Sequence, residues 1–248
     1  MEGMMLHCGG KPCKLDDLKT FDIPKETNTY SPLSHFDFAT NVTNVAKDMW
    51  SGFELTSQQH AVTGEGKRYF GLLTFQEKGN KLGLDDLSRA IAIRNSYDKS
   101  MKAGIALGAT VFVCDNLMLS GDVVRLRKHT KNIHADLEDS IISVLYKFKD
   151  TLKVLKKDKD ALSQVEIHNN LAYEILGYML GNNIITPRQF PKAKREWLKP
   201  TDNCFTDRNL WSLYNAVTAA MKSTPPHKIM ESHRKLHAHM LDRYSISA

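Results

Sequence analysis

The pattern of apolar and polar positions first shows the spacing of a helix. Apolar residues from Phe36 to Met49 recur at intervals of three and four, which places them on one helix face. This helix is predicted to begin near Ser34 or His35 and to end at Ser51-Gly52, where glycine favours a helix stop. One face of the helix is therefore expected to be buried.

The pattern then changes to the period of two that is typical of strands. Residues 53–62 and 68–75 are predicted to form a hairpin, with Gly64-Glu65-Gly66 as its turn. Residues 88–95 alternate between apolar and polar, which predicts a third strand with one face exposed to water. These three strands suggest a small antiparallel sheet.

Residues 101–119 allow two interpretations. Their alanine, isoleucine and leucine residues suit a buried helix, whereas the run Val111-Phe112-Val113-Cys114 suits a central strand. Gly104 and Gly108 permit close backbone approach in either case. Because β-branched residues favour strands, we expect a strand at least over residues 109–114.

The second half of the chain has a helical period. A helix is predicted from Asp122 onward, where the aspartate can cap its start, and an apolar stripe runs from Ile133 to Leu155. A basic connector punctuated by prolines lies between the later helices. Those helices are expected over residues 162–180, 209–221 and 227–244, and the prolines are Pro187, Pro191 and Pro200.

This segregation of elements predicts an α+β fold, with a small antiparallel sheet packed with helices in the N-terminal part and an all-helical C-terminal part. We expect an irregular lead-in over residues 1–30, because Gly9-Gly10 and Pro12 interrupt regular elements. An α+β core then covers residues 31–120, and a helical region over residues 121–248 packs on it as one unit.

The composition is that of an ordinary globular protein. The 248 residues are 42% hydrophobic and 25% charged, which excludes a disordered or collagen-like chain. We find no run of 18 apolar residues, so no membrane partner is expected. The four cysteines do not suggest a disulfide framework, and the N-terminus lacks a secretory signal, so we expect a cytoplasmic protein. The net charge of +6 favours a polyanionic partner.

The first half of the chain contains several short, distinctive sequence motifs. They are Tyr30-Ser31-Pro32-Leu33-Ser34-His35, Gln58-Gln59-His60-Ala61-Val62, Tyr69-Phe70-Gly71-Leu72-Leu73, Arg94-Asn95-Ser96-Tyr97-Asp98-Lys99-Ser100, Val113-Cys114-Asp115-Asn116 and Lys128-His129-Thr130. In this order, over residues 27–131, the chain resembles the phage/plasmid-like protein family, a domain of unknown function. The resemblance implies a phage or mobile-element origin, and hence the cytoplasm of a bacterial host, but no particular activity.

The resemblance also shows one departure. Many family members have a glycine before the serine of the Asp-Gly-Ser word, and this chain has Lys99 there. A lysine removes the permissive backbone of glycine and adds a positive charge.

The first candidate site lies where the third strand ends. Arg94 could bind a phosphate through its forked guanidinium, and neighbouring polar groups could donate to a nucleic-acid backbone. The alternative, weighted equally, is a polar strand end whose Asn and Asp side chains bond the local backbone as an Asx-turn. The residues assigned to nucleic acid here are Arg94, Asn95, Ser96, Lys99 and Lys102.

Two short basic segments are further candidates. Residues 122–131 carry four cations against one acid, and residues 188–199 carry five against one. Cations follow phosphates and aromatic rings stack on bases, and Phe190 and Trp197 interleave the second segment. The alternative is that these two segments are a solvated helix face and a linker. We also interpret the lysines in residues 147–159 as a solvated face. The residues assigned to nucleic acid are Arg125, Arg127, Lys128, Lys194 and Arg195.

Catalytic and metal sites are less well supported. Cys114 with His60 or His129 could form a nucleophile pair, but the apolar run before Cys114 favours an inert, buried thiol. His60, Asp98 and His129 could serve a hydrolase or nuclease only if they converge.

Short metal motifs are incomplete. His7-Cys8 and Cys13 have no second ligand pair, and the group of His233, His237 and His239 is interpreted as part of a solvated helix. The P-loop, nucleophile-elbow and dinucleotide-loop motifs are absent from the sequence. We therefore assign no catalytic residue, metal or cofactor.

Three functions from different classes remain. The leading hypothesis is a phage-encoded protein that binds single-stranded DNA or anneals strands in replication or recombination, because the order helix, hairpin, strand, helices resembles phage annealing proteins and the charge is basic. Such proteins commonly form rings, so a homo-oligomer is expected. The alternative is an interaction protein that disables a host defence factor. The third is a hydrolase or nuclease.

Overall fold

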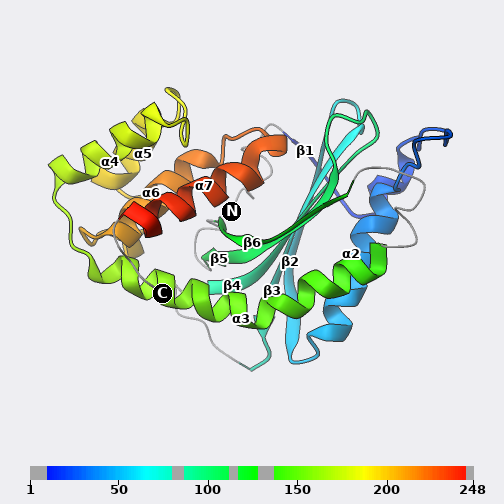
Figure 1. Ribbon diagram of the computed structural model, residues 1–248, viewed down its shortest axis with the longest axis horizontal. Helices are drawn as coiled ribbons and strands as arrows, with labels where there is room; N and C mark the ends of the chain where they lie inside the picture. Colours follow the sequence, from blue (N-terminus) through cyan, green and yellow to red (C-terminus); the bar gives the residue numbers. More distant parts are fainter. Residues whose placement is uncertain (1–9, 80–86, 112–116, 128–136, 244–248) are drawn as a thin grey trace.

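A six-stranded antiparallel sheet forms the N-terminal half of the chain, and helices form the C-terminal half, which confirms the predicted α+β fold (Figure 1). The computed structural model describes residues 10–79, 87–111, 117–127 and 137–243. The strands follow one another across the sheet in chain order. They are β1 (Lys11–Cys13), β2 (Phe53–Thr63), β3 (Arg68–Glu77), β4 (Leu87–Ser96), β5 (Ala103–Val111) and β6 (Leu117–Arg127).

The predicted first helix and hairpin are confirmed. Helix α2 (His35–Met49) begins at Ser34, whose side chain accepts a hydrogen bond from the Asp37 backbone N–H. The turn between β2 and β3 holds Gly64, Glu65 and Gly66 at positive φ angles of 58°, 58° and 85°. This conformation explains the glycines, because residues with a Cβ rarely adopt it.

The sheet is wider than the sequence pattern indicated. The predicted helix from Asp122 is wrong, because β6 continues to Arg127 and pairs with β5, with Val124 opposite Ala106. The lead-in also contains regular structure: β1 pairs with β2, and a short 3-10 helix η1 (Asp16–Thr20) follows it. A strand is stabilised by pairing and packing with residues outside its own segment, so the pattern within the segment does not reveal it.

The C-terminal half is helical, as predicted, but one helix was missed. Helix α5 (Phe190–Leu198) occupies the predicted connector, with Pro191 in the first turn, where its missing N–H costs nothing. The other helices are α3 (Leu137–Gln164), α4 (Asn169–Gly181), α6 (Leu210–Met221) and α7 (Pro226–Arg243), with a 3-10 turn η3 (Asn203–Phe205) before α6.

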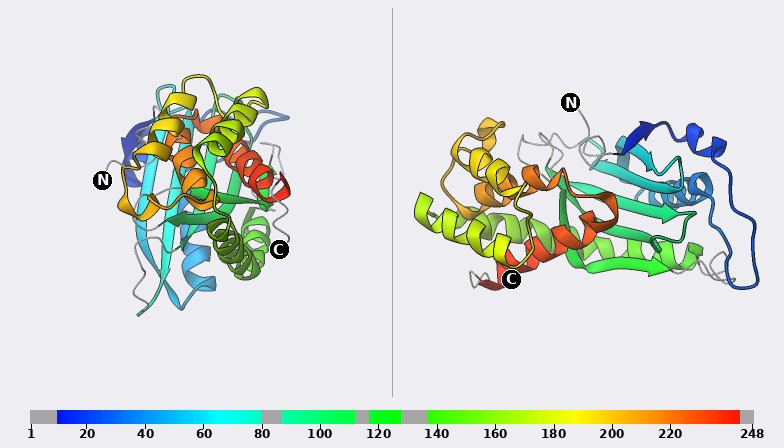
Figure 2. Two further views of the ribbon diagram at one scale, coloured as in Figure 1. Left: turned by 90° about the vertical axis from the view of Figure 1, so that its left-hand side faces the viewer. Right: turned by 90° about the horizontal axis from the view of Figure 1, so that it is seen from above.

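Helices cover both faces of the sheet. Side chains of α2 and of the first turns of α3 pack on one face, around Tyr69 and Phe75. Ile229 and Met230 of α7 pack on the opposite face, against Phe70. A separate core lies within the helical part, which extends beyond one end of the sheet (Figure 2).

Helix α3 joins the two parts of the molecule. Its N-terminal half contributes Ile141 and Leu145 to the core under the sheet, and its C-terminal half contributes Leu155 and Leu162 to the core of the helical part. Among the described helices, α3 included, we find none long and apolar enough to cross a membrane.

Candidate nucleic-acid interface

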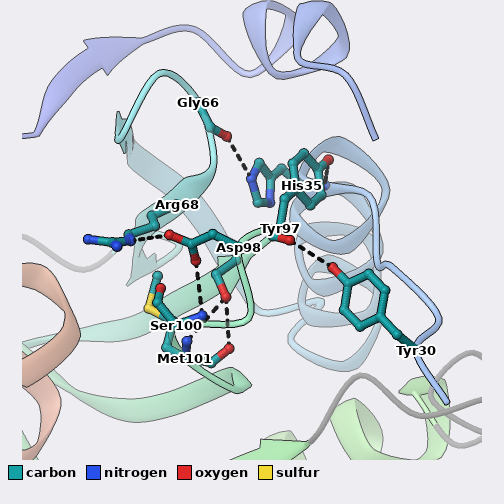
Figure 3. A network of polar contacts seen from close by, with 9 residues as sticks. Tyr30, His35, Gly66, Arg68, Tyr97, Asp98, Ser100 and Met101 are labelled. Atoms are coloured by element: carbon teal, nitrogen blue, oxygen red, sulfur yellow. Dashed lines mark hydrogen bonds and ion pairs between the residues drawn. The ribbon is translucent and has the colours of Figure 1, made fainter. Parts of the chain in front are cut away.

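A buried polar network holds the end of β4 against the start of α2 (Figure 3). The Asn95 side-chain amide donates to the Leu33 carbonyl at 2.6 Å and lies 2.9 Å from His35 Nδ1. His35 Nδ1 therefore accepts, which leaves the proton on Nε2, 3.1 Å from the Gly66 carbonyl that accepts it. Residues from three separate segments are thus fixed around one imidazole.

Two tyrosines extend this network. The Tyr97 ring stacks on His35 at a centroid distance of 3.7 Å, and its hydroxyl accepts from the His35 backbone N–H at 2.9 Å. The Tyr30 hydroxyl donates to the Tyr97 carbonyl at 3.1 Å. Burial raises the pKa of both tyrosines above its ordinary value, so both hydroxyls stay protonated.

Asp98 organises the turn between β4 and β5. Its carboxylate accepts from Arg68 Nε at 2.7 Å and from the Ser100 backbone N–H at 3.0 Å. Partial burial opposes ionisation, but the contacts with Ser100 and Arg68 outweigh it and lower the pKa of Asp98. The hydrogen bond to Ser100 forms an Asx-turn, which was the alternative interpretation of this strand end.

The structure separates the residues predicted at this first site. Asn95 and Ser96 have no exposed surface, and Ser96 bonds the Met101 backbone, so the prediction that they contact nucleic acid is wrong. Arg94 is half-buried, and burial lowers the pKa of its guanidinium while Glu231 of α7 partly offsets this. Lys99 and Lys102 are exposed in the turn.

Lys99 stands in the left-handed region, with a φ of 61°. Many members of the family that the chain resembles have a glycine at this position, and glycine adopts this conformation freely. The Lys99 ammonium lies 4.4 Å from the centre of the Tyr30 ring. This cation–π contact holds the lysine side chain against Tyr30.

The second predicted segment lies on the outer strand β6. Arg125 and Arg127 occupy register positions opposite Ile105 and Ala103, two core residues of β5. Lys128 lies outside the described residues. The segment is therefore strand rather than solvated helix face.

Helix α5 contains most of the third predicted segment, and its residues fall into a buried group and an exposed group. Ala193 and Trp197 point into the helical core, where the Trp197 indole N–H donates to Asn169 at 3.0 Å. The prediction that Trp197 stacks on bases is therefore wrong, and Phe190 also packs partly against this core. Lys194 and Arg195 remain exposed on the outer side of the helix.

Positive charges crowd together beside this helix. Burial lowers the pKa of Lys192, and Lys222 at the end of α6 and Arg195 lower it further, against the opposing effect of Glu196. From the sequence, Lys192 was counted among the cations of residues 188–199 but not assigned to nucleic acid, and Lys222 was not considered because it is distant along the chain. Only the packing of α5 on α6 brings them together.

Of the residues considered for catalysis, His60 and Asp98 lie within the described structure, and each has partners of its own. His60 Nδ1 lies 2.9 Å from the Tyr69 hydroxyl, and burial lowers the pKa of His60 to about 4. Asp98 is engaged elsewhere, by Arg68 and Ser100. Cys114 and His129 lie outside the described residues.

His233, His237 and His239 of α7 pack against other groups, so their interpretation as part of a solvated helix is wrong. His233 and His237 are buried, and His237 Nε2 lies 3.2 Å from the Asp158 carboxylate of α3. His239 stacks on Tyr178 with ring centres 4.6 Å apart. Within the described ranges we find no group of three potential metal ligands.

The polar network and the family match concern the same part of the chain. The motifs around residues 30–35, 69–73 and 94–100 meet at one end of the sheet. A family model matches residues 26–241 of the chain. The chain belongs to the family called domain of unknown function DUF932. No curated protein and no solved structure matches the chain significantly.

Proposed function

We propose that this member of the DUF932 family binds nucleic acid, with single-stranded DNA favoured, and promotes annealing of strands during phage or mobile-element replication and recombination. The observation that carries the proposal is the outer face of α5. Lys194 and Arg195 are exposed there, beside Lys192 and Lys222, whose charges repel one another. A phosphate backbone relieves this repulsion, because each phosphate brings a negative charge between cations.

The position of Trp197 bears on annealing. Because its ring is buried, this face offers cations without its tryptophan. Such a surface holds the backbone and leaves base edges free to pair, which annealing requires. A surface that stacked every base on an aromatic ring would instead compete with pairing.

The charged surface is tested by neutralising it. We expect K194Q/R195Q to weaken binding of a single-stranded oligonucleotide and to reduce the slope of log K against log salt by about 1.4, since each single-strand phosphate contact contributes about 0.7. The matched control is K47Q/K157Q, which removes two exposed lysines from α2 and α3. An unchanged slope in K194Q/R195Q would remove α5 from the interface.

A second candidate function is binding of a protein, either a host factor or another copy of the chain. It is favoured by the outer side of α3, where Tyr146 is 79% exposed. Ile142, about one turn before it, and Val154, about two turns after it, are also exposed. Exposed apolar groups of this kind mark interaction surfaces. Light scattering of the purified protein distinguishes self-association from a monomer that awaits a host partner.

A further inference from the structure

A pocket of about 220 Å³ lies between the sheet and α3, at the end of the sheet opposite the polar network. Its lining combines apolar side chains with three cations and one acid, Glu77, among the described residues. None of these residues was assigned to a binding site from the sequence, and Lys153 and Lys156 were interpreted as part of a solvated face. The lining residues that matter here are Phe53, Phe75, Arg89, Leu152, Lys153 and Lys156.

Arg89 is held in place by two aromatic rings. Its guanidinium carbon lies 3.6 Å from the centre of the Phe53 ring and 5.1 Å from that of Trp50. Burial lowers the pKa of Arg89, and Glu77 partly offsets that effect. A guanidinium fixed in this way loses little freedom when it binds an anion, and its fork matches phosphate oxygens.

Two lysines of α3 add charge to the same pocket. Lys153 and Lys156 are three residues apart, so their side chains are neighbours on one helix face. With Arg89 they make three cations against Glu77, and this excess favours an anionic ligand. The apolar lining suits a ligand that also carries an aromatic or apolar group.

The size of the pocket limits the ligand. Sites for drug-sized molecules occupy roughly 300–1,000 Å³. A pocket of about 220 Å³ holds a single small unit, not a strand laid along it.

We propose that this pocket binds one phosphate-bearing nucleotide, with the phosphate on Arg89, Lys153 and Lys156 and the base or sugar against Phe53 and Leu152. The choice of a nucleotide among organic phosphates rests on the proposed function. The nucleotide is either free or part of a bound strand, and both sources present the same chemistry.

The first arm of the test uses a free nucleotide. Thymidine monophosphate is titrated into the full chain by calorimetry, with thymidine as the ligand that lacks phosphate. We expect the phosphate ester to bind, thymidine to show no measurable binding, and K153Q/K156Q to bind the ester at least tenfold more weakly. R89K, which keeps the charge but loses the planar fork, should also weaken it. The control K47Q/K157Q should match the unmodified protein.

The second arm uses a single-stranded thymidine oligonucleotide and the same variants. Weaker oligonucleotide binding in K153Q/K156Q than in the control identifies a nucleotide of the strand as the ligand. Binding of the monophosphate without binding of the oligonucleotide supports the pocket and contradicts the proposed function. Oligonucleotide binding that depends on α5 but is unchanged in K153Q/K156Q, with no binding of the monophosphate, overturns the pocket and leaves the proposed function standing.

Discussion

Lys99 shows what a single residue can reveal before a function is known. It occupies a turn between two strands with a φ of 61°, a conformation that costs a residue with a Cβ about 1 kcal/mol or more. The resemblance to a family with glycine at this position pointed to a special backbone here. What the sequence alone did not show is that the lysine keeps the left-handed conformation.

We predict that Lys99→Gly is more stable than Lys99→Ala by about 1 kcal/mol. Both substitutions remove the charge and the contact with the Tyr30 ring, so their difference isolates the backbone. Urea unfolding of the two variants measures it. Equal stability would show that the left-handed conformation at position 99 is not strained.

His60 is a second residue whose effect can be measured, through the pH dependence of the protein's stability. Because burial lowers its pKa to about 4, the unfolded chain binds a proton to this histidine at a higher pH than the folded chain does. Its contribution to stability is therefore complete above about pH 6.5 and is lost as the pH falls toward 4, by roughly 3 kcal/mol in total.

The comparison of the unmodified protein with His60→Gln tests this expectation. We expect the variant to be less stable at pH 7, because it alters the contact with Tyr69, but to lose less stability between pH 7 and pH 4. Denaturant unfolding at several pH values measures both effects. Identical pH dependence in the two proteins contradicts the assignment of this acid sensitivity to His60.

At the scale of elements, local periodicity was sufficient to locate the early elements but not to show which faces are buried. The strand predicted over residues 88–95 is β4, and most of its residues on both faces are buried, so the expectation of a face exposed to water is wrong. Helix α2 and strands β2, β3 and β4 follow the predicted bounds within a few residues. Local periodicity failed where long-range packing decides the structure. Strand β6 is stabilised by pairing with β5, and α5 forms in a segment of prolines and cations because Ala193 and Trp197 reach the helical core. Neither partner can be identified from the segment itself.

The contact between α3 and α7 was missed for the same reason. Asp158 and His237 are 79 positions apart, and their side chains are 1% and 6% exposed. Asp158 also raises the pKa of the nearby Tyr214 hydroxyl, after the larger effect of burial. The pair therefore joins α3 to α7 in the core of the helical part, beside Tyr214 of α6.

We predict that His237→Leu lowers the free energy of unfolding by about 3 kcal/mol or more, because it leaves the buried Asp158 without its partner. The double variant D158L/H237L removes the stranded carboxylate and should recover part of this loss. Urea unfolding of the unmodified protein, of His237→Leu, of Asp158→Leu and of the double variant gives the coupling energy. A double variant that is no more stable than the sum of the two single losses would show that the groups do not interact.

At the scale of the whole molecule, the net charge of +6 predicted an anionic partner but not its place. The exposed cations of α5 and of the turn between β4 and β5 lie at opposite ends of the molecule (Figure 1). Several residues assigned from the sequence proved to be structural, such as Asn95. Others that now matter, such as Arg89 and Lys222, were not assigned, because their neighbours come from distant parts of the chain.

The most direct measurement is fluorescence anisotropy of labelled single-stranded and double-stranded oligonucleotides with the unmodified protein, titrated across salt concentrations. The proposed function predicts micromolar or tighter binding to single strands, weaker binding to duplex, and a steep loss of affinity as salt rises. Absence of single-strand binding at low salt would contradict it, because even non-specific phosphate contacts are strongest there.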